Sequence, residues 1–336
     1  MTRPSARLEY FLKQMNAPQV DLPVLRPGSA GKELLLLIVL TVGLFLSITF
    51  VPLVGFFPCM LTPAPTAVAV IRWGLPNAWL VPGCSAVIGA VILYLLNLSD
   101  SIAYLLALIG MGALIGYGFR CQWSTEKIVG LSSLFVIGMA GLFVILAFTE
   151  TKGEMVQLIE QDLRSAISTA LKQLGSSSPE TQEMEKNLLE TVPLVVRIMP
   201  GVLVSCILAI SWLNLLVLLR YCRAAATEYC VRTKLILWKA PEFIVWFVIG
   251  GGLMMLLPVG GLKMPAINVI IVTGTIYFLQ GVAIVAFYLE RWKSPFYVKG
   301  FVYALLFLQQ FVSMAAAVLG LFDVWFDFRK PRKKPA

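Results

Sequence analysis

The sequence predicts an all-α, polytopic transmembrane helix bundle. About nine long segments are almost free of charged side chains, and hydrophobic residues make up 59% of the chain. Charged residues make up only 13%, against about 25% in soluble proteins. About 20 helical residues cross the hydrocarbon core of a bilayer, where a backbone must satisfy its own hydrogen bonds. The segments lack the alternating pattern of a barrel strand, so helices are expected.

The apolar segments set the expected order of elements along the chain. A basic segment, 1–33, precedes the first span and lacks the apolar region and cleavage site of a signal peptide. Five spans then occupy 34–149, a soluble insert 150–192, and four spans 193–323, before a basic tail at 324–336. The nine expected spans are 34–50, 53–71, 78–96, 102–119, 128–148, 195–219, 243–257, 266–288 and 297–322.

The distribution of lysine and arginine predicts the orientation. With the N-terminus in the cytoplasm, the loops on that side carry most of the 27 cations, whereas the short loops opposite hold only Lys263. This asymmetry follows the positive-inside rule and predicts a cytoplasmic N-terminus. Nine spans, however, place the basic tail outside. Either the rule governs this late segment weakly or one span is miscounted, the proline-containing 53–71 being the first candidate.

The insert 150–192 reads as an external helical hairpin. Apolar residues such as Met155, Ile159 and Leu163 recur at helical spacing until Gly175. Ser178 and Pro179 then cap and open a second helix, expected to run to about Glu190. The apolar stripe either packs the two helices together or onto the membrane surface, or serves as a lid or partner-docking surface over the external mouth.

The residues that usually reveal chemistry are scarce. The chain has no histidine, its six cysteines form no CxxC pair, and no Asp, Glu, Lys or Arg lies near the centre of an expected span. We therefore expect no enzyme, no catalytic or metal residue and no cofactor, and an autonomous ion-coupled carrier is disfavoured. The net charge of +9 is interpreted as cytoplasmic anchoring, with the lipid bilayer rather than nucleic acid as the partner.

Two kinds of feature inside the spans are candidates for a site. Helices broken by proline or glycine either line a cavity or form tight turns, and amide side chains either bond across helices or face a ligand. The breaks are Pro58, Thr62, Pro63 and Pro65 in one segment, and Gly250–Gly252 with Pro258–Pro265 in another; the amides are Asn268, Gln280, Gln309 and Gln310. The small-residue faces Gly112/Gly116 and Ala316/Gly320 allow close helix contact, and so could meet other membrane subunits.

The end of the last span carries two aspartates, Asp323 and Asp327, at i and i+4. Such a pair could hold a divalent ion. We expect instead an anchor at the membrane–water boundary, because Arg329 and several aromatic residues accompany the pair.

Three strings carry a resemblance to a known family. GLFDVWFDFRK at 320–330, LTPAP at 61–65 and RWG at 72–74 resemble the YybS-like family of bacterial inner-membrane proteins, over roughly 34–330. That family has no established activity, so the resemblance assigns no functional residue. Its arrangement is similar to the substrate-binding subunits of energy-coupling-factor vitamin transporters and to the cell-shape protein MreD, although nine spans exceed the six typical of those subunits.

Two functions fit these features. The first is a small-molecule-binding or transport subunit that lacks its own energy source and relies on partners. The second is a structural or scaffolding protein of envelope assembly. An intramembrane enzyme is the least favoured class.

Overall fold

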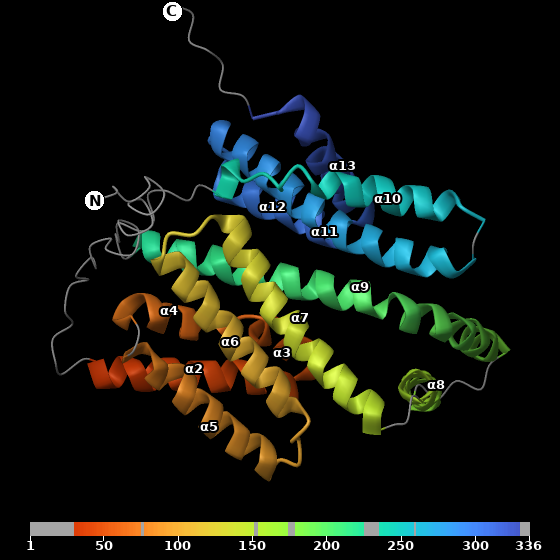
Figure 1. Ribbon diagram of the computed structural model, residues 1–336, viewed down its shortest axis with the longest axis horizontal. Coiled ribbons are helices and arrows are strands. Elements are labelled where there is room, and N and C mark those ends of the chain that lie inside the picture. Colours follow the sequence, from red (N-terminus) through yellow and green to blue (C-terminus); the bar gives the residue numbers. More distant parts are fainter. Residues whose placement is uncertain are drawn as a thin grey trace, which may run out of the picture.

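The computed structural model describes residues 30–74, 77–150, 154–173, 179–224, 235–258 and 260–329. The described part is helical and contains no strand (Figure 1), which confirms the expected helix bundle. Its helices are α2 (Ala30–Phe50), α3 (Pro52–Cys59), α4 (Pro63–Trp73), α5 (Leu80–Leu95), α6 (Ser101–Arg120), α7 (Thr125–Glu150), α8 (Met155–Gln173), α9 (Pro179–Ala224), α10 (Ile244–Leu256), α11 (Gly260–Arg291), α12 (Phe296–Leu308) and α13 (Gln310–Phe326), with short 3-10 turns η1 (Asn77–Trp79) and η3 (Leu235–Leu237).

Fewer helices can cross a membrane than the nine expected. In the described residues, six segments are long and apolar enough: α2, α3 with α4, α6, α7, α9 and α11. α5 and α10 are shorter apolar helices. The last expected span is not continuous, because α12 and α13 meet at an angle of 96°. Gln309 has an extended backbone there, and the Ser313 hydroxyl donates to the carbonyl oxygen of Leu306 at 2.6 Å.

The long helix α9 lies between two groups of helices (Figure 1). α4, α6 and α7 contact it on one side and α11 on the other. The largest buried cluster centres on α6, whose Leu105, Leu108, Met111 and Ile115 are almost fully buried. Burial of this apolar surface packs α4, α5 and α7 around α6.

The small-residue faces are used inside the chain. A Cβ on Gly112 would overlap the Pro63 carbonyl and the Thr66 hydroxyl of α4, and one on Gly320 would overlap the Tyr277 carbonyl of α11. These glycines therefore allow helices of the same chain to approach closely. That these faces also meet other membrane subunits stays a prediction.

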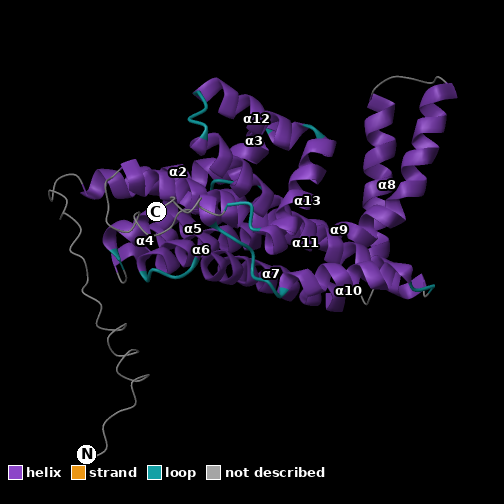
Figure 2. Ribbon diagram, turned by 90° about the horizontal axis from the view of Figure 1, so that it is seen from above, coloured by secondary structure: helices purple, strands orange, loops and turns teal. Residues whose placement is uncertain are grey.

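The hairpin is built differently from the expectation. α8 carries the predicted apolar stripe, with Leu171 buried and Met155, Ile159 and Leu163 half-buried. Its partner is not a separate helix that ends near Glu190. It is the first part of α9, a single helix of 46 residues that continues into the membrane segment. In Figure 2, α8 and the start of α9 stand side by side, across the direction of the rest of α9. Two prolines inside α9, Pro193 and Pro200, explain how one helix bends, because each removes a backbone donor.

Both ends of the bent pair α12–α13 lie at one end of the bundle. Leu235 packs in the same cluster as Leu219 and Cys222 at the end of α9. Arg329 then donates to the carbonyl oxygens of Ile236 and Trp238 beside it. We call this the cation-rich end, defined by Arg72, Arg120, Arg220, Lys239, Arg291 and Arg329. α12 leaves this end and α13 returns to it.

A pair of helices bent in this way is either a broken span or a re-entrant loop. The contact of Arg329 with the segment before α10 favours the re-entrant loop, which would put the basic tail on the side that the positive-inside rule predicts. Lys330 and the residues after it lie outside the described residues, as does the basic segment before Ala30.

The arrangement of α12–α13 gives a test of topology. In a cysteine-free background, cysteines introduced at Lys293 and Pro331 should react from the same side of the membrane, and one at Gln157 in α8 from the opposite side. Labelling of intact cells with an impermeant thiol reagent would show this. Reaction of the Pro331 cysteine together with the Gln157 cysteine would mean that α12–α13 crosses the bilayer.

Candidate functional site

An apolar groove runs between the helices α9, α10 and α11. Its volume is about 460 Å³, within the range of about 300–1,000 Å³ typical of small-molecule sites. α10 and the residue before it supply two aromatic rings, Phe243 and Phe247. The complete lining is Pro200, Gly201 and Val204 from α9, Phe243, Ile244 and Phe247, and Asn268, Val269, Val272, Thr273 and Ile276 from α11.

Asn268, one of the candidate amides, cross-links two walls of this groove. Its Nδ2 donates to the carbonyl oxygens of Arg197 and Met264, both at 2.9 Å, and its Oδ1 accepts the Gly201 N–H at 2.5 Å. Arg197 and Gly201 are four residues apart, the spacing of a helical backbone hydrogen bond. The amide thus pairs with α9 beside Pro200, where the helix lacks a donor.

The polar side chains of the lining are already engaged. Asn268 bonds the backbone of α9 and α11, and the Thr273 hydroxyl donates to the Val269 carbonyl at 2.8 Å. The remaining lining side chains are hydrocarbon or glycine. A charged or strongly polar ligand would lose its hydration there without compensation, so the groove suits an apolar ligand.

The glycine run expected to break the seventh span does not do so. Gly250–Gly252 lie inside α10, which continues to Leu256. A Cβ on Gly251 would lie 3.1 Å from Ile270 Cγ1 of α11. Gly251 therefore allows α10 to pack closely on α11, whereas a Cβ on Gly250 or Gly252 would meet no atom within 4 Å. The helix ends only before Pro258.

A buried polar network holds the chain that leads into α10. Arg329 Nη2 lies 2.5 Å from Asp323 Oδ2, and Gln280 Nε2 donates to the same oxygen at 3.0 Å. Arg329 Nη1 donates to the carbonyl oxygens of Ile236 at 2.9 Å and Trp238 at 2.7 Å. Asp323 is 0% exposed and Arg329 only 4%. The C-terminal end of α13 is thereby tied to the segment before α10.

Three further hydrogen bonds complete this network. Gln280 Oε1 accepts the Ala240 N–H at 3.1 Å, and Asp323 Oδ1 accepts the Phe328 N–H at 2.9 Å. The Tyr288 hydroxyl donates to the Phe328 carbonyl at 2.9 Å. Gln280 precedes the end of α11 by about three turns, or about 16 Å, so the network reaches well inside the bundle.

The expected anchor at the membrane–water boundary stays a prediction, but the structure buries Asp323 inside the protein. Asp323 is enclosed by α11 and the segment before α10, because α13 turns inward instead of leaving the bundle. Asp327 does not share its site. It has a left-handed backbone (φ 46°) and pairs with Lys239 at 2.6 Å, partly exposed. The two aspartates therefore pair with different cations instead of converging on one ion.

The proline-rich break is closed by protein groups. Thr62 is fully buried, and its hydroxyl donates to the Cys59 carbonyl at 2.7 Å. Asn214 of α9 donates to the Met60 carbonyl at 2.8 Å. Pro63 and Pro65 are buried in α4, and Pro58 is half-buried in α3. The carbonyl oxygens freed by the break at Cys59 and Met60 are thus paired within the bundle, and this observation favours a turn over a cavity lining.

Gln309 and Gln310 are not brought to the groove or the network. Both are exposed at the bend between α12 and α13. Gln309 serves as the residue at which one helix ends and the next begins.

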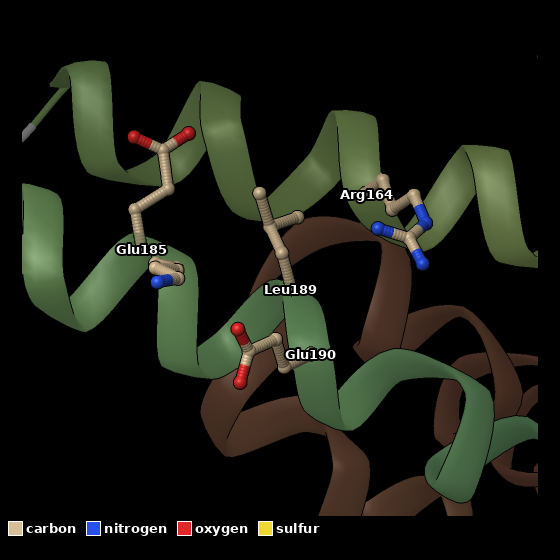
Figure 3. A pocket seen from close by; sticks show the side chains of 5 residues that line it. Arg164, Glu185, Leu189 and Glu190 are labelled. Carbon is tan, nitrogen blue, oxygen red and sulfur yellow. The ribbon is translucent and has the colours of Figure 1, made fainter.

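A second hollow, of about 400 Å³, lies in the hairpin between α8 and α9 (Figure 3). Arg164 of α8 faces Glu185, Lys186, Leu189 and Glu190 of α9 across it. Its two acids and two bases cancel, so the hollow offers no net charge to select a ligand.

The fold and the groove define a polytopic helical membrane protein. A family model described as a predicted membrane protein, DUF2232, matches residues 39–324. The chain therefore belongs to that family. Neither a curated protein nor a solved structure matches it.

Proposed function

We propose that this protein is a small-molecule-binding or transport subunit of the bacterial inner membrane, with its ligand in the groove between α9, α10 and α11. The observation that carries the proposal is the groove itself, whose lining is hydrocarbon apart from two polar side chains that already have partners. Sites of this kind bind ligands by burying their apolar surface.

The same lining supports a subunit without its own energy source, and without enzymatic activity. No lining residue carries a charge, so the groove offers no group for coupling to a proton or sodium gradient. It likewise offers no acid or base for catalysis, and its one hydroxyl, on Thr273, already donates to the Val269 carbonyl. The cation asymmetry supports a cytoplasmic N-terminus.

Filling the groove tests the proposal. Val272 is a partly exposed lining residue, so Val272→Phe should occupy the ligand's volume while the helix remains folded. Native mass spectrometry of protein extracted gently from membranes should find a small molecule retained by the wild type and lost from Val272→Phe. The matched control is Val202→Phe, because Val202 is exposed on α9 and does not line the groove.

The alternative is a structural or scaffolding function. The observation that favours it is the hairpin, which exposes Val156 and Leu158 on α8 and Met184 and Leu188 on α9. Exposed apolar side chains of this kind are typical of interaction surfaces. If Val272→Phe and Val202→Phe retain the same bound molecules as the wild type, the binding function is wrong and this alternative replaces it.

A further inference from the structure

We propose that the ligand of the groove is an anionic phospholipid, with one acyl chain in the groove and the phosphate beside Arg197. This inference rests on the proposed binding function and adds the class of ligand. It joins two observations: an apolar groove with exposed aromatic walls, and an arginine at one end of it that has no carboxylate partner among the residues the structure describes.

The groove fits an acyl chain in both chemistry and position. Its wall residues Phe243 and Phe247 are largely exposed, so the groove is open on its outer side, where the bilayer chains lie. A chain entering sideways from the bilayer would exchange one hydrocarbon environment for another. Its gain is close contact with the aromatic rings and with the valines of α9 and α11.

Arg197 gives the groove a positive end. It is exposed, and it lies one turn before Gly201 and two turns before Val204, so the three residues share one face of α9. In the described ranges, ion pairs join Arg72 to Glu33, Lys239 to Asp327 and Arg329 to Asp323, and none involves Arg197. An arginine at the margin of a membrane helix binds phosphate well, because its planar guanidinium forms two hydrogen bonds at once.

The opposite end of the groove lies towards the cation-rich end, but Lys239 and Arg329 there already have carboxylate partners. Glu242 immediately precedes Phe243 there. A lipid with a negative headgroup is therefore favoured in one direction only, with the phosphate at Arg197 and the chain extending towards Phe243.

The test compares two lipids with identical acyl chains. Detergent-purified, delipidated full-length protein is titrated with phosphatidylglycerol or phosphatidylcholine, and bound lipid is counted by native mass spectrometry. One cation near a membrane surface is worth about 1 kcal/mol of attraction to anionic lipid, a factor of about five in Kd. The wild type should bind one phosphatidylglycerol saturably, about five-fold more tightly than phosphatidylcholine.

Two variants separate the headgroup from the chain. Arg197→Gln should abolish the preference for phosphatidylglycerol and leave binding of phosphatidylcholine intact. Arg220→Gln, an exposed cation at the other end of α9, is the control and should keep the preference. Val272→Phe should lose both lipids. A preference that persists in Arg197→Gln, or that is absent from the wild type, overturns the anionic-lipid inference while groove binding stands. Lipid binding unchanged in Val272→Phe overturns the proposed function itself.

Discussion

Asp323→Asn is expected to destabilise the folded protein by about 3–5 kcal/mol, the cost of removing one partner from a buried ion pair. The carboxylate accepts hydrogen bonds from Arg329, Gln280 and the Phe328 N–H. Asparagine keeps one acceptor oxygen, and its amide nitrogen would face one of these donors. Arg329 would then stay buried without a counter-charge. Thermal unfolding in detergent, followed by circular dichroism, should show a large decrease in midpoint.

The neighbouring aspartate provides the matched control. Asp327 pairs with Lys239, and both side chains are partly exposed, at 34% and 44%. An exposed pair contributes about 0–1 kcal/mol, so Asp327→Asn should change the midpoint little. The double variant Asp323→Asn/Arg329→Gln should recover part of the loss, because it removes the uncompensated charge. Equal effects of Asp323→Asn and Asp327→Asn would show that burial of the pair contributes nothing to stability.

Gly112→Val should also destabilise strongly, because the added Cβ overlaps backbone of α4. The overlapping atoms are the Pro63 carbonyl and the Thr66 hydroxyl, which are hydrogen-bonded to each other at 2.8 Å. Neither can move away without breaking that bond or shifting α4. Overpacking a tight core typically costs about 1–3 kcal/mol, and the loss should appear as a lower midpoint in the same unfolding measurement.

Gly141→Val on α7 is the control for this substitution. No atom lies within 4 Å of a Cβ built on Gly141, so valine there should be neutral or slightly stabilising, since glycine is a poor helix former. If Gly112→Val were as stable as Gly141→Val, the close contact between α4 and α6 would not be required for folding.

The spans were predictable because apolar runs report membrane crossing directly. α2, α6, α7 and α11 fall where the hydropathy places them. The path of the last segment was not predictable. Residues 297–322 read as one span, and nothing in their composition fixes the extended backbone at Gln309 or the return of α13 to the cation-rich end.

The contacts of the candidate site residues were likewise predictable only in part. For Asn268 and Gln280 the sequence left two alternatives open, bonding across helices or facing a ligand; both side chains bond to a neighbouring element. The burial of the Asp323–Arg329 pair could not be read from the sequence, because the carbonyl oxygens of Ile236 and Trp238, to which Arg329 donates, are about 90 residues away. The groove and Arg197 were also missed. A groove is a property of three helices together, and Arg197 lay just inside an otherwise apolar run.

The contact between Arg329 and Ile236 also sets an order of events during synthesis. The two residues are 93 positions apart, and a ribosome adds about 5–20 residues per second. The segment before α10 must therefore wait about 5–20 seconds after its own emergence for the arginine that binds its carbonyl oxygens. During that interval the carbonyl oxygens of Ile236 and Trp238 lack the guanidinium that binds them in the folded protein. A nascent chain interrupted before residue 329 would stay in that state, and so would be a natural substrate for quality-control proteases.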